Sequence, residues 1–352
     1  MNAGQGAGLA LEALLSQALD PPRAHGMAPA SGRLRMLAED FEVEEDLGFA
    51  PDGEGSHLLL HVRKREANTE WVARELARLA GCRVGDVGYA GLKDRHALAL
   101  QWFSVPAGGR AAQEWAGARG EGFEVLAAHA HRRKLPRGAL AGNRFRLRVR
   151  ELQAEPQALE ARLRALAARG VPNYFGEQRF GQRGGNLAWL SGGAAPEWRR
   201  LRAHERSLLL SSARSVIFNA VLAARVLDGS WEQLTAGDVA ILDGRGSIFS
   251  VPEVDAQLLE RCARLALHPT GPLWGRGTPP TTGVPLEREQ RIAGALASAC
   301  EALIGAGMRQ ERRSLRLLVH ELQWRREPDG LELSFRLTRG AYATVVMREL
   351  LT

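Results

Sequence analysis

The sequence has 352 residues, 45% of them hydrophobic and 25% charged, with a formal net charge of +7. This composition is typical of globular proteins, and the length predicts two domains or one domain with a large insertion. The basic balance favours a polyanionic partner such as nucleic acid over an acidic small substrate. Lysine occurs only at positions 64, 93 and 134, so the abundance of arginine also fits a coding bias.

The cysteines and the apolar pattern indicate the compartment. Cys82, Cys262 and Cys300 are too few and too far apart to predict a disulfide framework or a zinc site. No apolar run is expected to be long enough to span a membrane, and the N-terminus lacks the basic and apolar regions of a secretion signal. We therefore expect a cytoplasmic protein without a membrane partner.

The first part of the chain predicts an extension, two strands and a helix. Residues 1–30 are rich in glycine and alanine and are expected to form a flexible extension with one short helix. Partial alternation over 35–44 and an apolar run over 57–62 predict strands. The apolar residues of 69–80 fall on one helical face, and Gly81 is expected to end that helix.

The stretch 88–96 has an unusual composition for a turn. Glycines flank an aromatic residue, and Lys93, Arg95 and His96 surround one carboxylate, Asp94, before an apolar strand begins. Glycine lets the backbone adopt conformations closed to other residues and lets a ligand approach closely. From composition alone, a solvated charged connection and an active-site loop are equally good interpretations.

A basic tract precedes a strongly alternating strand. The tract, 129–137, is interpreted either as a phosphate-contacting arm or as a solvated loop. In the strand, 143–150, alternation places Asn143 and Phe145 on one face and the arginines on the other. Asn143 offers an amide for base edges and Phe145 a ring for stacking, although the core is the commoner place for a phenylalanine.

The rest of the chain predicts helical material enclosed by strands. Residues 171–181 mix aromatic and polar groups without a period, which predicts a domain junction or a binding loop. The other expected elements are helices over 156–169, 208–227 and 287–304, a hairpin over 239–249, a Pro/Gly-rich loop over 268–285, strands over 315–324 and 331–337, and a final helix from about residue 340.

Five blocks resemble, in order, the motifs of one enzyme family, the TruD-type tRNA pseudouridine synthases. They run from about residue 31 to the C-terminus. The match is highly specific, because five separate motifs would have to agree by accident. The blocks are Glu39-Asp40-Phe41-x-Val43 with Leu47-Gly48-Phe49-x-Pro51-Asp52-Gly53-Glu54-Gly55, Ala90-Gly91-Leu92-Lys93-Asp94-Arg95-His96-Ala97 with Gln101-Trp102, Gly138-Ala139-Leu140-x-Gly142-Asn143-x-Phe145, Val171-Pro172-Asn173-Tyr174-Phe175-Gly176-x-Gln178-Arg179-Phe180-Gly181, and Gly340-Ala341-Tyr342-Ala343-Thr344.

The resemblance implies an α+β fold. Its pseudouridine-synthase catalytic domain has a mixed, mostly antiparallel sheet and is interrupted by a large inserted α/β domain. The change of texture at residue 171 and the return to strands near residue 315 give the boundaries. We expect a flexible extension over 1–30, the first part of the catalytic domain over 31–170, the inserted domain over 171–314 and the last part of the catalytic domain over 315–352.

The resemblance also implies a cofactor-free isomerase that turns uridine into pseudouridine in transfer RNA, at uridine 13. The family's nucleophilic aspartate matches Asp94. A carboxylate is ionised near neutral pH and can add covalently to the nucleoside, at C1′ of the ribose or C6 of the base, while the base detaches, rotates and rejoins through carbon. No metal is expected.

Further roles follow from the same matches. The basic partner of the aspartate, commonly lysine, matches Arg35, which keeps the charge and changes the geometry. Lys93 is expected to hold the loop or contact phosphate. The expected substrate-binding residues are Asn143, Phe145 and Tyr342, the last in place of the family's usual phenylalanine, and the expected contacts to the RNA backbone are Arg132, Arg133 and Lys134.

Two other classes of function compete. A non-catalytic RNA-binding or RNA-chaperone protein on the same fold would not require a lone carboxylate in a polyanion-binding cleft. A metal-dependent nuclease would need several clustered carboxylates, and those of 39–46 are interpreted as a mostly solvated strand edge. A monomer with no obligate protein partner is expected, with transfer RNA as its partner.

Overall fold

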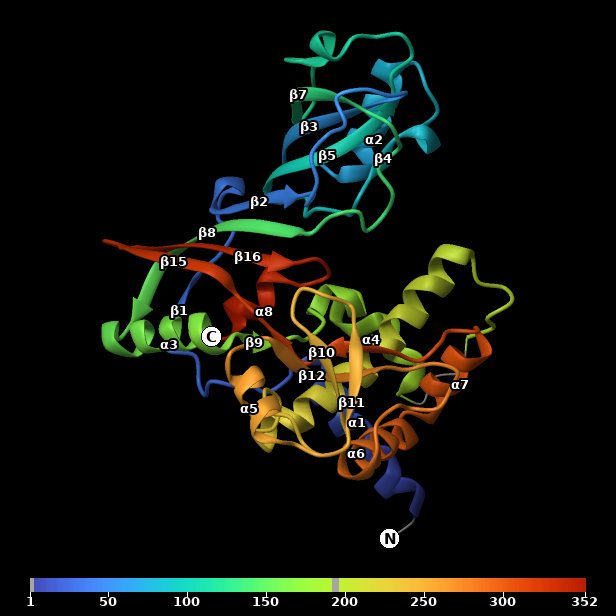
Figure 1. Ribbon diagram of the computed structural model, residues 1–352, viewed down its shortest axis with the longest axis vertical. Coiled ribbons are helices and arrows are strands. Elements are labelled where there is room, and N and C mark those ends of the chain that lie inside the picture. Colours follow the sequence, from blue (N-terminus) through green and yellow to red (C-terminus); the bar gives the residue numbers. More distant parts are fainter. Residues whose placement is uncertain (1–2, 192–195) are drawn as a thin grey trace. The chain divides into compact units, whose positions relative to one another are not determined.

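The computed structural model describes residues 3–191 and 196–352, which form two compact units (Figure 1). The sheet unit comprises Pro29–Glu160, Val319–Ala343 and Leu351–Thr352, and the helical unit comprises Met1–Ala28, Ala161–Leu318 and Thr344–Leu350. The expected inserted domain, 171–314, falls within the helical unit, and its limits stay a prediction. Residues 1–2 of the expected extension and 192–195 of the expected insertion lie outside the described residues.

One ten-stranded sheet forms the sheet unit, in the order β15-β16-β8-β2-β5-β3-β7-β6, with β1 paired to β8 and β4 to β5 (Figure 1). Its pairings are antiparallel except that of β2 with β5, so the expected mixed, mostly antiparallel sheet is confirmed. The strands are β1 (Ala30–Arg33), β2 (Phe41–Asp46), β3 (His57–Arg65), β4 (Gly88–Tyr89), β5 (Leu98–Pro106), β6 (Arg119–Gly120), β7 (Phe123–His131), β8 (Gly142–Ala154), β15 (His320–Glu327) and β16 (Gly330–Thr338).

Helix α2 (Thr69–Ala80) packs on this sheet through its apolar face. Val72 and Leu76, one turn apart, are fully buried in a cluster with Leu60 and Phe103. Burying a side chain of this size stabilises the fold by roughly 1.5–3 kcal/mol. Gly81 ends the helix in the left-handed conformation, with φ of 64°, as predicted. The cluster joins β3, β4 and β5 to α2 through buried side chains.

Strand β8 alternates as predicted. Phe145, Leu147 and Val149 are buried, and the arginines on the other face contact carboxylates. These ion pairs are Arg144–Glu321 at 2.8 Å, Arg146–Glu332 at 3.1 Å, Arg148–Glu327 at 3.0 Å and Arg150–Asp40 at 2.8 Å. The arginine face of β8 is therefore neutralised by its own unit and is not a free basic surface.

The helical unit holds a four-stranded sheet in the order β11-β10-β12-β13, a two-stranded ladder of β9 and β14, and most of the helices. Its strands are β9 (Val171–Pro172), β10 (Asp238–Leu242), β11 (Ile248–Val251), β12 (Leu267–Leu273), β13 (Glu311–Ser314) and β14 (Arg316–Leu317). Its helices are α1 (Ala3–Leu19), α3 (Pro156–Arg169) from Ala161 on, α4 (Ala203–Leu227), α5 (Ala256–Ala263), α6 (Gly283–Ala295), α7 (Ala297–Gly305) and α8 (Ala343–Arg348) from Thr344 on.

Helix α4 corrects the expectation that no segment has the length and apolarity to cross a membrane. By length and composition it meets that description, with a mean hydropathy of 1.5 over its most apolar window. Two-thirds of that window, 67%, is buried within the structure. Burial of these apolar residues in the core of the helical unit accounts for the long hydrophobic run.

Parts of two segments, one expected as a domain junction or binding loop and the other as a loop, belong to the core of the helical unit. Residues 171–176 are buried, and Phe175 donates its N–H to Asn219 Oδ1 at 2.9 Å, so this segment is not an exposed binding loop. The segment expected as a loop over 268–285 begins with the paired strand β12. The helix expected over 287–304 is two helices, α6 and α7, separated at Leu296.

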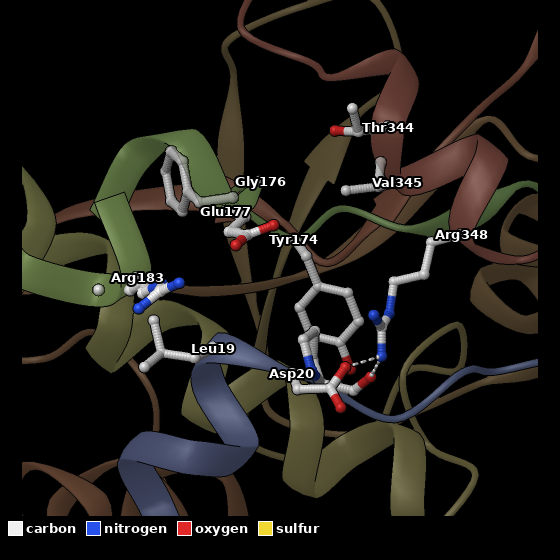
Figure 2. Close-up of a pocket in the computed structure, with 12 residues that line it drawn as sticks. Leu19, Asp20, Tyr174, Gly176, Glu177, Arg183, Thr344, Val345 and Arg348 are labelled. Carbon is white, nitrogen blue, oxygen red and sulfur yellow. Dashed lines mark hydrogen bonds and ion pairs between the residues drawn. The ribbon is translucent and has the colours of Figure 1, made fainter. Parts of the chain in front are cut away.

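The segment expected to be a flexible extension contains helix α1 and is anchored. Leu15 and Ala18 are buried. Arg348 donates to Asp20 Oδ1 and to the carbonyl of Pro21, both at 2.5 Å, across one edge of a cavity of about 450 Å³ (Figure 2). Tyr174, whose ring stands in the same cavity, donates to the carbonyl of Pro22 at 3.3 Å.

Candidate active site

Asp94 lies on the connection between β4 and β5. These strands pair antiparallel, with Tyr89 opposite Phe103, so residues 90–97 form the loop at their end. The Asp94 side chain is 44% exposed, and its Oδ2 accepts a hydrogen bond from Arg35 Nη2 at 2.9 Å. A solvent-accessible carboxylate and one guanidinium thus meet at the tip of the loop.

Arg35 is held by two side-chain contacts and has a strained backbone. Besides its contact with Asp94, its guanidinium lies over the ring of Phe41, 4.1 Å from the centroid. Its backbone is in the left-handed region, with φ of 59°, which is a strained conformation for a residue with a Cβ. Such strain persists only where surrounding contacts hold it, and it clusters at functional sites.

A buried ion pair lies directly beneath the loop. Lys93 Nζ pairs with Glu45, and their side chains are 7% and 0% exposed. The other Glu45 oxygen accepts the backbone N–H of Trp102 at 3.0 Å. Lys93 therefore holds the loop and does not extend toward a phosphate. The expectation of a mostly solvated strand edge is wrong for Glu45, and also for Asp40, which is buried.

Two further buried side chains hold the main chain of the loop. Thr69 Oγ1 accepts the N–H of Lys93 at 3.0 Å and donates to Gln101 Oε1 at 3.1 Å. The Gln101 amide in turn donates to the carbonyl of Gly91 at 2.7 Å. Both Thr69 and Gln101 are buried, so water does not compete for these hydrogen bonds.

Lys64 also holds the main chain of the loop. Its side chain is fully buried, and its ammonium donates to the carbonyls of Ala67 and of Asp94 itself, both at 2.8 Å. Burial lowers the pKa of Lys64 to about 8, although the negative charge of Asp94 acts in the opposite direction. Sequence reasoning missed this residue. The available signal was a lysine in phase with Leu60 and Val62 on the buried face of a strand.

The unfolding free energy should depend on pH through Lys64. The folded protein releases this proton at about pH 8 and the unfolded chain near 10.5, so the unfolded state binds more protons between these values and stability rises there. Relative to a Lys64→Met variant, we expect the wild-type unfolding free energy to gain on the order of 3 kcal/mol from pH 7 to 11. Urea titrations of both proteins measure this. A constant difference across that range would contradict the lowered pKa of Lys64 in the folded protein.

The ring of Phe145 belongs to an aromatic cluster next to Arg35. It is 6% exposed and lies 6.1 Å from Phe41 and 5.5 Å from Phe335, centroid to centroid. Contacts thus run from Asp94 through Arg35 and Phe41 to Phe145. The cluster leaves the Phe145 ring little free face in this structure, and its stacking on a base stays a prediction.

Asn143 stands opposite Glu45 in the pairing of β8 with β2, and opposite Leu337 in the pairing with β16. Its Oδ1 is buried and has no hydrogen-bond partner among the residues that the structure describes. A buried carbonyl oxygen without a donor is uncommon and calls for an explanation. Tyr342 follows the end of β16 by four residues, and its approach to Asp94 stays a prediction.

The three basic residues expected to contact the RNA backbone differ in their partners. Arg132 forms an ion pair with Glu54 at 2.6 Å, and Lys134 donates to the carbonyl of Gly85. Arg133 is exposed and has no ion-pair partner in the described chain. Within residues 3–191 and 196–352, no group of three or more histidine, cysteine, aspartate or glutamate side chains is placed to hold a metal ion.

Comparisons with known proteins agree along almost the whole chain. The family model described as tRNA pseudouridine synthase D (TruD) matches residues 23–188 and 194–350. The tRNA pseudouridine synthase D of Methylococcus capsulatus is 47% identical over 332 residues, covering 94% of this chain and 94% of that protein. The protein of the same name from Pseudomonas entomophila is 48% identical over 334 residues, with 94% of each chain covered.

One solved structure supports the fold. The crystal structure of the putative tRNA pseudouridine synthase D (TruD) from Methanosarcina mazei matches with a TM-score of 0.73 and 23% sequence identity. The match covers 96% of this chain and 98% of that chain. The two proteins therefore share the α+β fold.

Proposed function

This chain belongs to the tRNA pseudouridine synthase D (TruD) family, and we propose that it acts on uridine 13 of transfer RNA with Asp94 as its nucleophile. As a member, it is a tRNA pseudouridine synthase, an isomerase of uridine. The target position and the nucleophile are proposed beyond that activity. The observation that supports Asp94 is its pairing with Arg35 on a loop whose main chain is held by buried side chains.

Asp94 has the chemistry that the covalent step needs. A carboxylate can add covalently to a nucleoside, and the side chain of Asp94 is 44% exposed. Arg35 contacts Oδ2, while Oδ1 has no hydrogen-bond partner in the part of the chain that the structure describes. A carboxylate held at one oxygen presents the other in a fixed direction, and such positioning is a large part of catalysis.

The uracil ring must leave the helical stack before it can react. It must then detach from C1′, rotate, and rejoin through C5, which loses a proton while N1 gains one. The unpartnered Oδ1 of Asn143 is covered in the free protein, and on this proposal it becomes accessible when RNA binds and accepts the N3–H of uracil. That hydrogen bond would satisfy an oxygen that is otherwise orphaned.

Replacement of this amide tests its role. We expect Asn143→Leu to lower the single-turnover rate about 10- to 100-fold, the equivalent of a lost hydrogen bond and an unmatched uracil N–H. Affinity for transfer RNA should change little, because phosphate contacts dominate it. The matched control is Asn68→Leu, an exposed amide that makes no capping hydrogen bond. A loss confined to RNA affinity would contradict the assignment.

The proposed position is tested with two transcripts. Purified protein, without added metal or cofactor, is incubated with a transfer RNA that has uridine at position 13 and with the same RNA carrying cytidine there, and pseudouridine is mapped. Pseudouridine at position 13 of the first RNA alone is the expected result. Product at another uridine would overturn the position, and absence of product from wild-type protein would overturn the activity.

A further inference from the structure

A groove in the sheet unit is lined by basic residues from two walls. One wall is formed by α2 and residues 84–89, and the other by residues 134–137, around a volume of about 730 Å³. Three cations line it, Arg74, Lys134 and Arg137, against one carboxylate, Glu70. The groove is therefore net positive, and it is distinct from the cluster of Asp94, Arg35 and Lys64.

The two arginines of this groove are not neutralised by the protein. Neither Arg74 nor Arg137 has a carboxylate within ion-pair distance among the described residues, in contrast to the four arginines of β8. Arg137 instead stacks on Tyr89, with 3.6 Å between its guanidinium carbon and the ring centroid. Stacking fixes the plane of a guanidinium and leaves its N–H donors free for a bidentate anion such as phosphate.

The second wall is rigid and joined to the catalytic loop. Leu135 is buried, and its N–H donates to Ser104 Oγ at 2.8 Å. A side chain at Gly88 would collide with the carbonyl of Leu135, so glycine is what lets the two walls approach. Gly138 donates its N–H to the carbonyl of Ala90 at 2.7 Å, four residues before Asp94.

We propose that this groove binds the sugar–phosphate backbone of the transfer RNA substrate, with Arg74 and Arg137 contacting phosphates. The inference rests on the proposed function, because it takes transfer RNA as the ligand. It changes the expected backbone contacts: Lys134 remains, whereas Arg132 is engaged by Glu54. Lys134 keeps donors for a phosphate, since an ammonium has three and one goes to Gly85.

The test is the salt dependence of RNA affinity. For an Arg74→Ala/Arg137→Ala variant, the slope of log affinity against log salt should become shallower by about 1 for each lost phosphate contact. Reckoned from equal affinities at 1 M salt, each lost contact makes the affinity at 0.1 M salt about eightfold lower. The single-turnover rate at saturating RNA should stay unchanged, because neither side chain acts on the base.

The matched control is Arg63→Ala/Arg119→Ala, which removes the same charge from arginines that both pair with Glu124. It should leave the slope at the wild-type value. If Arg137→Ala impairs folding through loss of the Tyr89 contact, Arg74→Ala alone, on the exposed face of α2, should still reduce the slope by about 1.

Three results would contradict RNA binding by this groove. The first is a wild-type salt slope for the Arg74/Arg137 variant, and the second is an equal loss of slope in both double variants. The third is a reduced single-turnover rate at saturating RNA. Binding is measured without turnover, so these results are independent of product formation. If wild-type protein bound RNA with the expected slopes but made no pseudouridine, the proposed function would fail and the groove would stand.

Discussion

Asp94→Asn is expected to abolish pseudouridine formation, with a loss of at least about 10⁴-fold in the single-turnover rate. An amide is neutral and is a far weaker nucleophile than a carboxylate, so the covalent step has no other means of starting. The change is nearly isosteric and lies at a 44%-exposed position, so folding should be preserved. Affinity for transfer RNA should be equal to or above the wild-type value, because one negative charge near the polyanion is removed.

Asp86→Asn is the matched control for this variant. Asp86 is also a carboxylate of the sheet unit paired with an arginine, Arg83, at 3.2 Å. Its removal should leave the rate within about twofold of wild type, since an exposed ion pair contributes little to structure. Pseudouridine formed by the Asp94→Asn protein at a rate near wild type would eliminate Asp94 as the nucleophile.

Glu45→Gln is expected to cost the sheet unit about 3–5 kcal/mol of unfolding free energy. The reason is that Lys93, whose side chain is only 7% exposed, would keep its charge without a partner. Adding Lys93→Met should recover much of that loss, because the second change removes the uncompensated charge. Urea unfolding followed in the sheet unit measures both variants.

The control for the buried pair is an exposed one. Glu39 and Arg65 form an ion pair at 2.6 Å with side chains 46% and 53% exposed. Glu39→Gln should therefore cost no more than about 1 kcal/mol. Equal losses from Glu39→Gln and Glu45→Gln, or a double variant at 45 and 93 less stable than Glu45→Gln alone, would contradict an uncompensated buried charge.

Local sequence signals predicted the elements whose causes are local. Helix α3 runs from Pro156 to Arg169 as its period and first-turn proline indicate, and the hairpin of β10 and β11 follows the Asp243-Gly244 turn signal. Strand β12 was missed because His268-Pro269-Thr270-Gly271-Pro272 reads as a loop, since proline cannot donate to a ladder. Its place between β10 and β13 is fixed by tertiary pairing, which no local signal encodes.

The candidate site divides in a similar way. Asp94 and Arg35 were found because they match family motifs, and the structure brings their side chains to 2.9 Å. The sequence did not identify the buried side chains that hold the loop, Glu45, Gln101 and Lys64. The role of a polar residue on a buried face can be inferred only when its partner is known. Each has a partner far away along the chain: Lys93 and Trp102 lie 48 and 57 residues from Glu45, Thr69 lies 32 from Gln101, and Asp94 lies 30 from Lys64.

The hydrogen bonds to Gly91, Lys93 and Asp94 have a consequence for the thermodynamics of RNA recognition. Fixing the backbone of one residue costs roughly 1–2 kcal/mol of conformational entropy. Because buried side chains already order residues 91–94 in the free protein, that loss is incurred during folding. For these four residues, the entropic cost that RNA binding avoids is about 4–8 kcal/mol. More of the binding free energy is then available for extracting the uridine from its stack.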